Sequence, residues 1–262
     1  PDTLVEFREI AQRGQCFLGF DGKLIAFRCR RDLDGLTIPL ISGDLELIAR
    51  NSEIRELYLE HSGVTDAMLF ELSPLQKLET LRLSGAPVTD DGLRVLSGFP
   101  NLKSLWLMDT NIQGPGLSNL SHVSRLMNLK IETRQGDEVL QYLTPLKDLS
   151  SLSISAPLTD RGFEFLATLP KLESLGLVDM EYSRSGIAML SASSSLKRLQ
   201  FDGGSIGDGD IDFLAKLTSI TEVTLVQTRV SQAGRNRLIQ LRPDILLVLP
   251  RDAMMTRSVV GR

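Results

Sequence analysis

The stretch LETLRLSGAPVTDDGLRVLSGFPN, residues 78–101, decides the fold. Its first six residues fit the pattern L-x-x-L-x-L, which predicts a short strand with its apolar side chains on one side. Those side chains belong to Leu78, Leu81 and Leu83. A short helix should follow after a loop, with an apolar stripe at i, i+3 spacing formed by Leu93, Leu96 and Phe99. One such unit cannot bury its stripe alone, so it needs similar neighbours.

The same pattern returns along the chain with a nearly constant period. Its first residues are Ile54, Leu78, Leu102, Leu126, Leu149, Leu172, Leu196 and Ile220. The successive differences are 24, 24, 24, 23, 23, 24 and 24 residues, which gives eight repeats. Stacked repeats of this length predict an α/β solenoid with one shared aliphatic core. We expect a parallel sheet on its concave side and helices on its convex side.

Three stretches carry a resemblance to a known family. They read LRLSGAPVTDDGLRVLSGFPNL at 81–102, ISAPLTDRGFEFLATLPKL at 154–172 and LVQTRVSQAGRNRLIQL at 225–241. They resemble the leucine-rich repeats with the motif VTDxGLxxL that are common in large bacterial proteins, and they are similar to the cysteine-containing type of F-box receptors. The resemblance implies a right-handed leucine-rich-repeat solenoid, or horseshoe, that binds other macromolecules. Departures from the family pattern affect the loops, where Ser62, Thr110 or Thr228 replaces the usual Asn or Cys.

The ends of a solenoid need caps, because they expose apolar stripe and unpaired strand. We interpret residues 1–53 as an N-terminal cap made of a helix over 2–13, a β-hairpin and a degenerate repeat. Eight repeats of 23–24 residues then occupy 54–243. Residues 244–262 should form a closing strand and a flexible tail.

The two cysteines, Cys16 and Cys29, fall on the predicted hairpin, whose turn is Asp21-Gly22. In that register Cys16 faces Phe27, and Cys29 lies one diagonal step away. This geometry disfavours a disulfide, although a register slip would allow one. So few cysteines favour a cytoplasmic protein.

Short oxygen side chains precede the predicted helices and are candidate N-caps. In the second repeat the candidate is Thr89 or Asp90. The corresponding residues elsewhere are Thr65-Asp66, Thr159-Asp160 and Asp208. The stretch GGSIGDGDID, at 203–212, superficially resembles a calcium loop but fails the EF-hand spacing.

The concave face should present the residues between the inward leucines of each strand. Trp106 is the only tryptophan, and the repeat phase points it outward. Tryptophan, tyrosine and arginine dominate interface energetics, which predicts a partner-binding hot spot centred on Trp106. The full candidate set is Trp106, Met108, Tyr58, Arg82, Lys130, Glu56 and Arg198. In the alternative, Trp106 folds over its neighbours or packs under a loop.

Composition and motifs point away from several functions. The net charge of -4 offers no general basic surface for nucleic acid, and no stretch reaches the roughly 20 apolar residues of a membrane span. His61 and His122 stand in different repeats with no ligand near in sequence, so we expect no metal site and no catalytic residue. No motif for a cofactor occurs.

These observations predict a non-enzymatic scaffold that binds an unidentified protein through the concave sheet. The start at Pro1 also suggests a structural spacer or oligomerisation domain of a larger protein. The sequence is further compatible with an enzyme that has an unrecognised site, and with a ubiquitin-transfer substrate receptor, although residues 1–53 do not look like an F-box. Arginines in the last repeat, at 229, 235, 237 and 242, form either a solvated terminal face or a site for an acidic partner or for membrane headgroups.

Overall fold

The L-x-x-L-x-L stretches form strands, because their apolar residues alternate across an extended chain. The computed structural model describes residues 11, 14–18, 23–29, 39–41 and 43–248. The chain divides into two compact units, residues 1–133 and 134–262. Apart from Ala11, the helix expected over 2–13 lies outside the described residues, as do the Asp21-Gly22 turn and the tail from 251.

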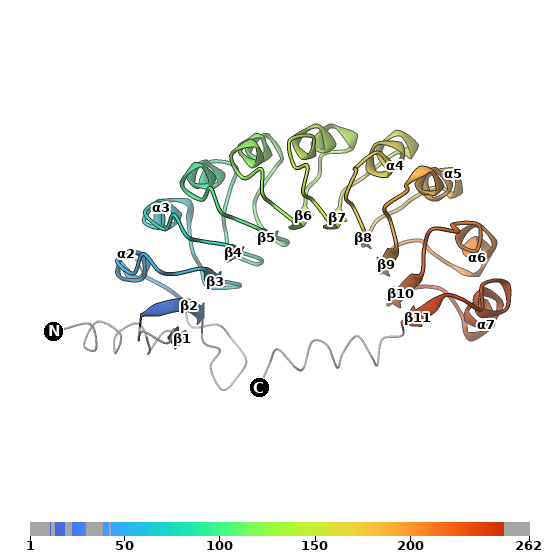
Figure 1. Ribbon diagram of the computed structural model, residues 1–262, viewed down its shortest axis with the longest axis horizontal. Coiled ribbons are helices and arrows are strands. Elements are labelled where there is room, and N and C mark those ends of the chain that lie inside the picture. Colours follow the sequence, from blue (N-terminus) through green and yellow to red (C-terminus); the bar gives the residue numbers. More distant parts are fainter. Residues whose placement is uncertain (1–10, 12–13, 19–22, 30–38, 42, 249–262) are drawn as a thin grey trace. The chain divides into compact units, whose positions relative to one another are not determined.

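In the described part of the first unit, six strands lie side by side in chain order (Figure 1). They are β1 (Gly14–Leu18), β2 (Leu24–Cys29), β3 (Glu56–Tyr58), β4 (Thr80–Arg82), β5 (Ser104–Leu107) and β6 (Asn128–Glu132). The helical segments are α2 (Asp44–Ala49), α3 (Asp66–Phe70) and the 3₁₀-helices η1 (Gly92–Gly98) and η2 (Pro115–His122). From β2 to β6 all neighbouring strands are parallel.

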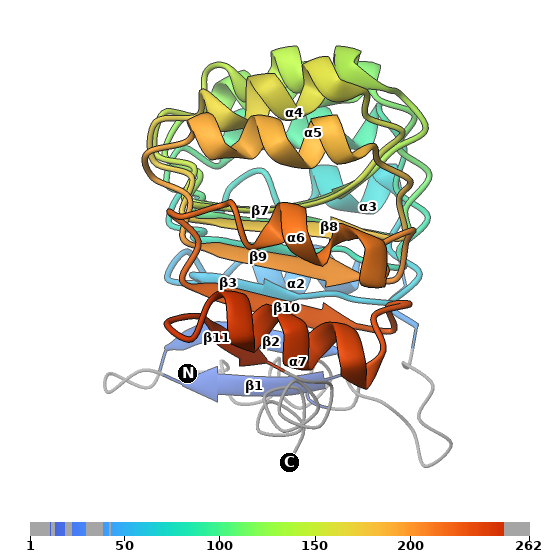
Figure 2. The same cartoon turned by 90° about the vertical axis from the view of Figure 1, so that its right-hand side faces the viewer.

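The second unit repeats this arrangement over its described residues. Its strands are β7 (Ser151–Ser155), β8 (Ser174–Val178), β9 (Arg198–Asp202), β10 (Glu222–Val226) and β11 (Leu246–Val248), all parallel to their neighbours. Its helices are η3 (Asp137–Leu143), α4 (Asp160–Ala167), α5 (Arg184–Met189), η4 (Leu190–Ala192), η5 (Asp208–Asp210), α6 (Ile211–Leu214) and α7 (Gln232–Leu241). The axes of α4, α5, α6 and α7 run in similar directions (Figure 2).

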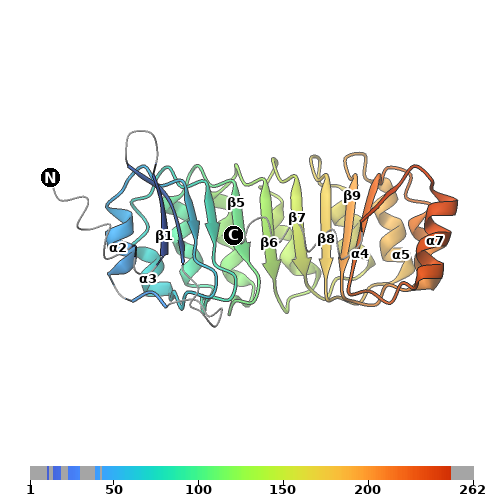
Figure 3. The same ribbon diagram turned by 90° about the horizontal axis from the view of Figure 1, so that it is seen from below.

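Helices cover one face of the sheet in each unit, and the aliphatic core lies between the two layers. Each of the eight residues that open a repeat is at most 1% exposed. The other face, which we call the open face, is the one predicted to be concave; Figure 3 shows the strands from this side, with helices behind them. The predicted α/β repeat fold, with a parallel sheet and helices on one face, is confirmed.

The N-terminal strands β1 and β2 form an antiparallel hairpin. Cys16 is opposite Phe27, as the sequence predicts, but the register shifts after Phe17, so that Leu18 faces Leu24 and Ile25 is bulged out. A β-bulge of this kind bends the strand and re-aims nearby side chains. Both Cys16 and Cys29 are free thiols.

The buried Cys29 thiol should make stability depend on alkaline pH. Burial raises the pKa of Cys29 to about 12, whereas an unfolded thiol ionises near pH 8.5, at about its reference value. The unfolded chain therefore releases this proton first, and the free energy of unfolding falls as pH rises from about 9 towards 12. Urea titrations across this range should show a shallower fall for Cys29→Ala. Equal slopes in the variant and the wild type would contradict this expectation.

Asp66 and Asp208, two of the aspartates predicted to cap helices, bind the following repeat instead, and Asp137, which the sequence did not single out, does the same. Asp66 accepts hydrogen bonds from the backbone N–H (2.8 Å) and hydroxyl (2.6 Å) of Thr89. Asp208 accepts the same pair from Ser231, at 2.7 and 2.6 Å, and Asp137 accepts the backbone N–H of Thr159 at 2.9 Å. Each carboxylate thus satisfies a donor 22 or 23 residues further along the chain.

The capping prediction was therefore wrong for Asp66 and Asp208. Thr65 and Thr159 do occupy the N-cap positions of α3 and α4, but neither side chain makes a capping bond. Asp91, not Thr89 or Asp90, holds the cap position of η1, also without a capping bond. The reason is geometric: stacking brings the donors of the next repeat within reach, and these compete with the free amides of the residue's own helix.

The glycine of the T-D-x-G motif leaves room for this interaction. A Cβ atom on Gly162 would lie 2.3 Å from Oδ1 of Asp137, and one on Gly92 would lie 2.3 Å from Oδ1 of Asp66. These distances are far below van der Waals contact, so the absence of a side chain is needed for close approach. The aspartate of one repeat and the glycine of the next thus act together to hold the two repeats against each other.

Candidate functional site

The parallel register of the first unit places one residue from each of five strands in a single row on the open face. Arg28 pairs with Tyr58, Tyr58 with Arg82, Arg82 with Trp106, and Trp106 with Lys130. Cations and aromatic rings therefore alternate along the row. We call these five residues the cation–aromatic ladder. At about 4.8 Å per strand it spans roughly 20 Å.

The side chains of the ladder stack on one another. The Arg82 guanidinium lies 3.6 Å from the centroid of the Trp106 ring and 4.6 Å from that of Tyr58. Arg28 lies 4.6 Å from the Tyr58 centroid, and the Lys130 ammonium lies 3.8 Å from that of Trp106. Each such contact contributes about 0.5–1 kcal/mol when exposed and about 2 when desolvated. The row is therefore ordered by its own contacts.

Carboxylates flank the ladder and neutralise part of its charge. Glu60 forms an ion pair with Arg82 at 3.7 Å, and the side chains of the two are 25% and 22% exposed. Glu56 accepts a hydrogen bond from the Tyr58 hydroxyl. Burial raises the pKa of Tyr58, and the hydrogen bond to Glu56 raises it further, so the phenol stays a neutral donor at physiological pH.

Trp106 points away from the aliphatic core, as the repeat phase predicts, and is half-buried. Leu105 and Leu107, on either side of it, are at most 1% exposed. The indole is covered by Arg82 and Lys130, so it does lie against its neighbours, but on the open face of the sheet. Among the candidates of the first unit, the structure thus brings Trp106, Tyr58, Arg82 and Lys130 into contact, with Glu56 bonded to Tyr58.

Three candidates fall outside the ladder: Glu56, which is bonded to Tyr58, Met108 and Arg198. Met108 follows β5, is half-buried, and belongs to the next outward position along the chain. Arg198 lies in the second unit, at the start of β9, where it pairs with Glu173 at 3.6 Å.

The chain resembles known proteins in its repeats. A family model described as Leucine Rich repeat matches residues 75–97. A crystal structure of internalin C2 from Listeria monocytogenes matches with a TM-score of 0.54 and 24% identity, over 79% of this chain and 82% of that one. A structure of internalin F from the same organism matches with a TM-score of 0.51 and 18% identity, over 78% and 69%. The chain has a leucine-rich-repeat fold.

The fold alone does not identify a function for this protein. As many as 297 chains of solved structures match it, and no curated protein does. Leucine-rich repeats support a general role in protein–protein interaction, but the kind of partner has to be inferred from the residues of the binding surface.

Sequence reasoning missed Arg28, the first member of the ladder. The signal was present, because Leu24, Phe27 and Cys29 occupy the three apolar positions of L-x-x-L-x-L, and all three are buried. The spacing from Leu24 to Ile54 is 30 residues, outside the regular period. In the structure β2 nevertheless pairs in parallel with β3, so Arg28 on β2 continues the row that Tyr58 belongs to.

Within the described ranges, the protein has no group of three or more His, Cys, Asp or Glu side chains that could hold a metal ion. His61 lies in the turn after β3, with its ring against Gly85, and His122 ends η2. Across those same ranges no helix has both the length and the apolar character needed to span a bilayer.

Proposed function

We propose that this protein is a non-enzymatic scaffold that binds a protein partner through the open face of its sheet, with Trp106 at the centre of the contact. The cation–aromatic ladder is the single observation that carries the proposal. Tryptophan, tyrosine and arginine are the residues that most often dominate binding energy, and here they are contiguous.

The preorganisation of the ladder supports this role. Binding normally costs about 0.5–1.5 kcal/mol for each long side chain that becomes ordered. Arg82 is already held between two rings and by Glu60 in the free protein, so less of this cost falls on association. Met108 and Glu56 belong to the proposed surface as flanking contacts. Arg198, in the second unit, is proposed as a separate contact on the open face of that unit.

Free, unbonded cysteines support a cytoplasmic location as part of the same proposal. The net charge of -4 favours a protein over a nucleic acid as partner. Stable recognition buries about 800 Å² on each side, so the partner should extend beyond the ladder itself.

The proposal is tested with Trp106→Ala once affinity capture has identified a partner. We expect binding to weaken at least about 30-fold, since hot-spot residues contribute about 2 kcal/mol or more. Ser104→Ala, a small change on the same strand and face, is the matched control and should leave the affinity unchanged. Isothermal titration calorimetry measures both variants.

An affinity of Trp106→Ala within twofold of wild type would contradict the proposed site. The indole is also a direct reporter, because no other tryptophan contributes to fluorescence. A partner that docks on the ladder should therefore change the emission of the wild type. Concentration-dependent self-association in sedimentation experiments, without such a partner, would instead favour an oligomerisation domain.

A further inference from the structure

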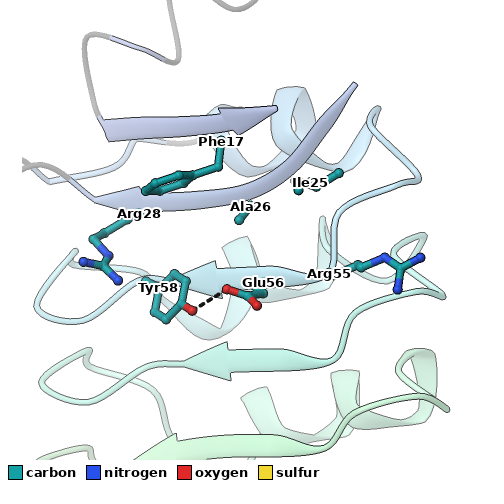
Figure 4. A pocket seen from close by; sticks show the side chains of 7 residues that line it. All are labelled: Phe17, Ile25, Ala26, Arg28, Arg55, Glu56 and Tyr58. Atoms are coloured by element: carbon teal, nitrogen blue, oxygen red, sulfur yellow. Dashed lines mark hydrogen bonds between the residues drawn. The ribbon is translucent and has the colours of Figure 1, made fainter. Parts of the chain in front are cut away.

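A pocket of about 300 Å³ opens at the N-terminal end of the ladder, between the hairpin and β3 (Figure 4). The side chain of Phe17 on β1 lines one side of the pocket, and those of Tyr58 and Glu56 on β3 line the other. Ala26 and the bulged Ile25 line the part between. The remaining lining residues are Arg28 and Arg55.

The pocket exists because Ala26, which lies in the same cross-strand row as Glu56, has a small side chain. Ala26 pairs with Glu56 on β3 and with Phe17 on β1, so its side chain belongs to the open face. It is only 7% exposed, although none of the helices in the described part of the chain covers this face. A larger residue at position 26 would fill the space between Phe17 and Tyr58.

The lining indicates what kind of group fits. Ligand pockets usually measure about 300–1,000 Å³, so this one suits a single side chain rather than an extended ligand. Its walls are mainly apolar, and Phe17 is 43% exposed in the free protein. An aromatic side chain would bury that ring and stack between Phe17 and Tyr58.

The charges at the mouth indicate what should lie next to that group. Two guanidinium groups, of Arg28 and Arg55, border the pocket against one carboxylate, of Glu56. Glu56 already accepts a hydrogen bond from the Tyr58 hydroxyl. Arg55 shares Glu79 with Lys103, at 3.1 and 2.6 Å, so two cations surround that carboxylate. The surroundings therefore favour an anion beside the aromatic group.

We propose that this pocket is an anchor site for an aromatic side chain that is flanked by an acidic residue in a protein partner. The inference deepens the proposed function and rests on it, because Arg28 and Tyr58 belong both to the pocket and to the ladder. A partner segment anchored here would continue along the row towards Trp106.

Short peptides test the pocket without knowledge of the partner. The probes are Ac-Asp-Phe-NH₂, Ac-Lys-Phe-NH₂ and Ac-Asp-Ala-NH₂, titrated into the ¹⁵N-labelled full chain up to about 10 mM, since ligands of this size bind weakly. We expect Ac-Asp-Phe-NH₂ to shift the amide resonances of Phe17, Ala26 and Tyr58. It should bind at least about threefold more tightly than the lysine peptide and tenfold more tightly than the alanine peptide.

Ala26→Leu fills the pocket and should weaken the binding of Ac-Asp-Phe-NH₂ at least tenfold. Ser104→Leu is the matched control, because it adds a leucine to the same row of the open face, outside the pocket, and should leave binding unchanged. Native-like spectra of both variants verify that each is folded. Phe17→Ala, on the exposed wall, is the second variant and should weaken binding without filling the pocket.

Three results would overturn the anchor site: no shifts at the highest concentration, equal binding of all three peptides, or unchanged binding by Ala26→Leu and Phe17→Ala. None of them touches the proposed function, which is measured at Trp106 with a protein partner. Conversely, Trp106→Ala could leave the affinity for the protein partner unchanged while the peptides still bind the wild type. That result would contradict the proposed function and leave the pocket as a site for small ligands alone.

Discussion

Replacing Phe99 by alanine should lower the free energy of unfolding by about 3–5 kcal/mol, the largest single effect expected in the first unit. Phe99 is completely buried and follows η1. Truncation removes most of its apolar surface and leaves a cavity that the stacked repeats on either side cannot close without shifting. Urea titration followed by the fluorescence of Trp106 measures the change.

Phe70→Ala is the control for this substitution. It removes the same atoms from α3, where Phe70 is 44% exposed, and should cost less than about 1 kcal/mol. Similar losses for the two variants would mean that the interior around Phe99 is not close-packed. The contrast tests burial itself, because residue type and unit are the same.

Arg242→Leu should destabilise the second unit by about 2–4 kcal/mol, because it leaves buried carbonyl groups without donors. The guanidinium of Arg242 donates to the carbonyl oxygens of Leu217 and Ile220, at 3.0 and 2.9 Å. It also makes two bonds to Asp244, at 2.8 and 2.7 Å. Its side chain is only 11% exposed. Leucine retains the aliphatic bulk, so the loss reports on the hydrogen bonds.

Arg237→Leu provides the matched comparison. Arg237 also makes two bonds to one carboxylate, that of Asp212, at 2.8 and 2.9 Å. Both partners are more than half exposed, and exposed ion pairs contribute little to stability because water screens them. Thermal or urea unfolding followed by circular dichroism should therefore separate the two variants clearly. Equal effects would mean that the carbonyl contacts of Arg242 contribute little.

The arginines of the last repeat also show how far sequence reasoning reaches. Their clustering was visible, but the sequence allowed either a solvated face or a site for an acidic partner. In the structure Arg237 and Arg242 bind carboxylates of this chain. Which carboxylate lies near which arginine depends on the packing of one repeat against the next, and the spacing of charges along the chain does not reveal it.

The outward position of Trp106 was, by contrast, a local property. Side chains alternate between the two faces of a strand, so the buried leucines at 105 and 107 fix the side to which residue 106 points. The same argument holds for Tyr58, Arg82 and Lys130. Their contacts could be expected only once a period of 24 residues placed them at equivalent positions of parallel strands.

The sequence by itself determined the repeat, the strand positions and the face on which each strand residue lies, because a period of two along a strand needs no distant information. Only the tertiary structure decided that Asp66 binds Thr89, that Arg28 begins the ladder and that Ala26 leaves a pocket beside Phe17. Each of these depends on the distance between residues that are 9 to 30 positions apart. Stacking and a single bulge set that distance, and neither follows from the pattern of apolar residues.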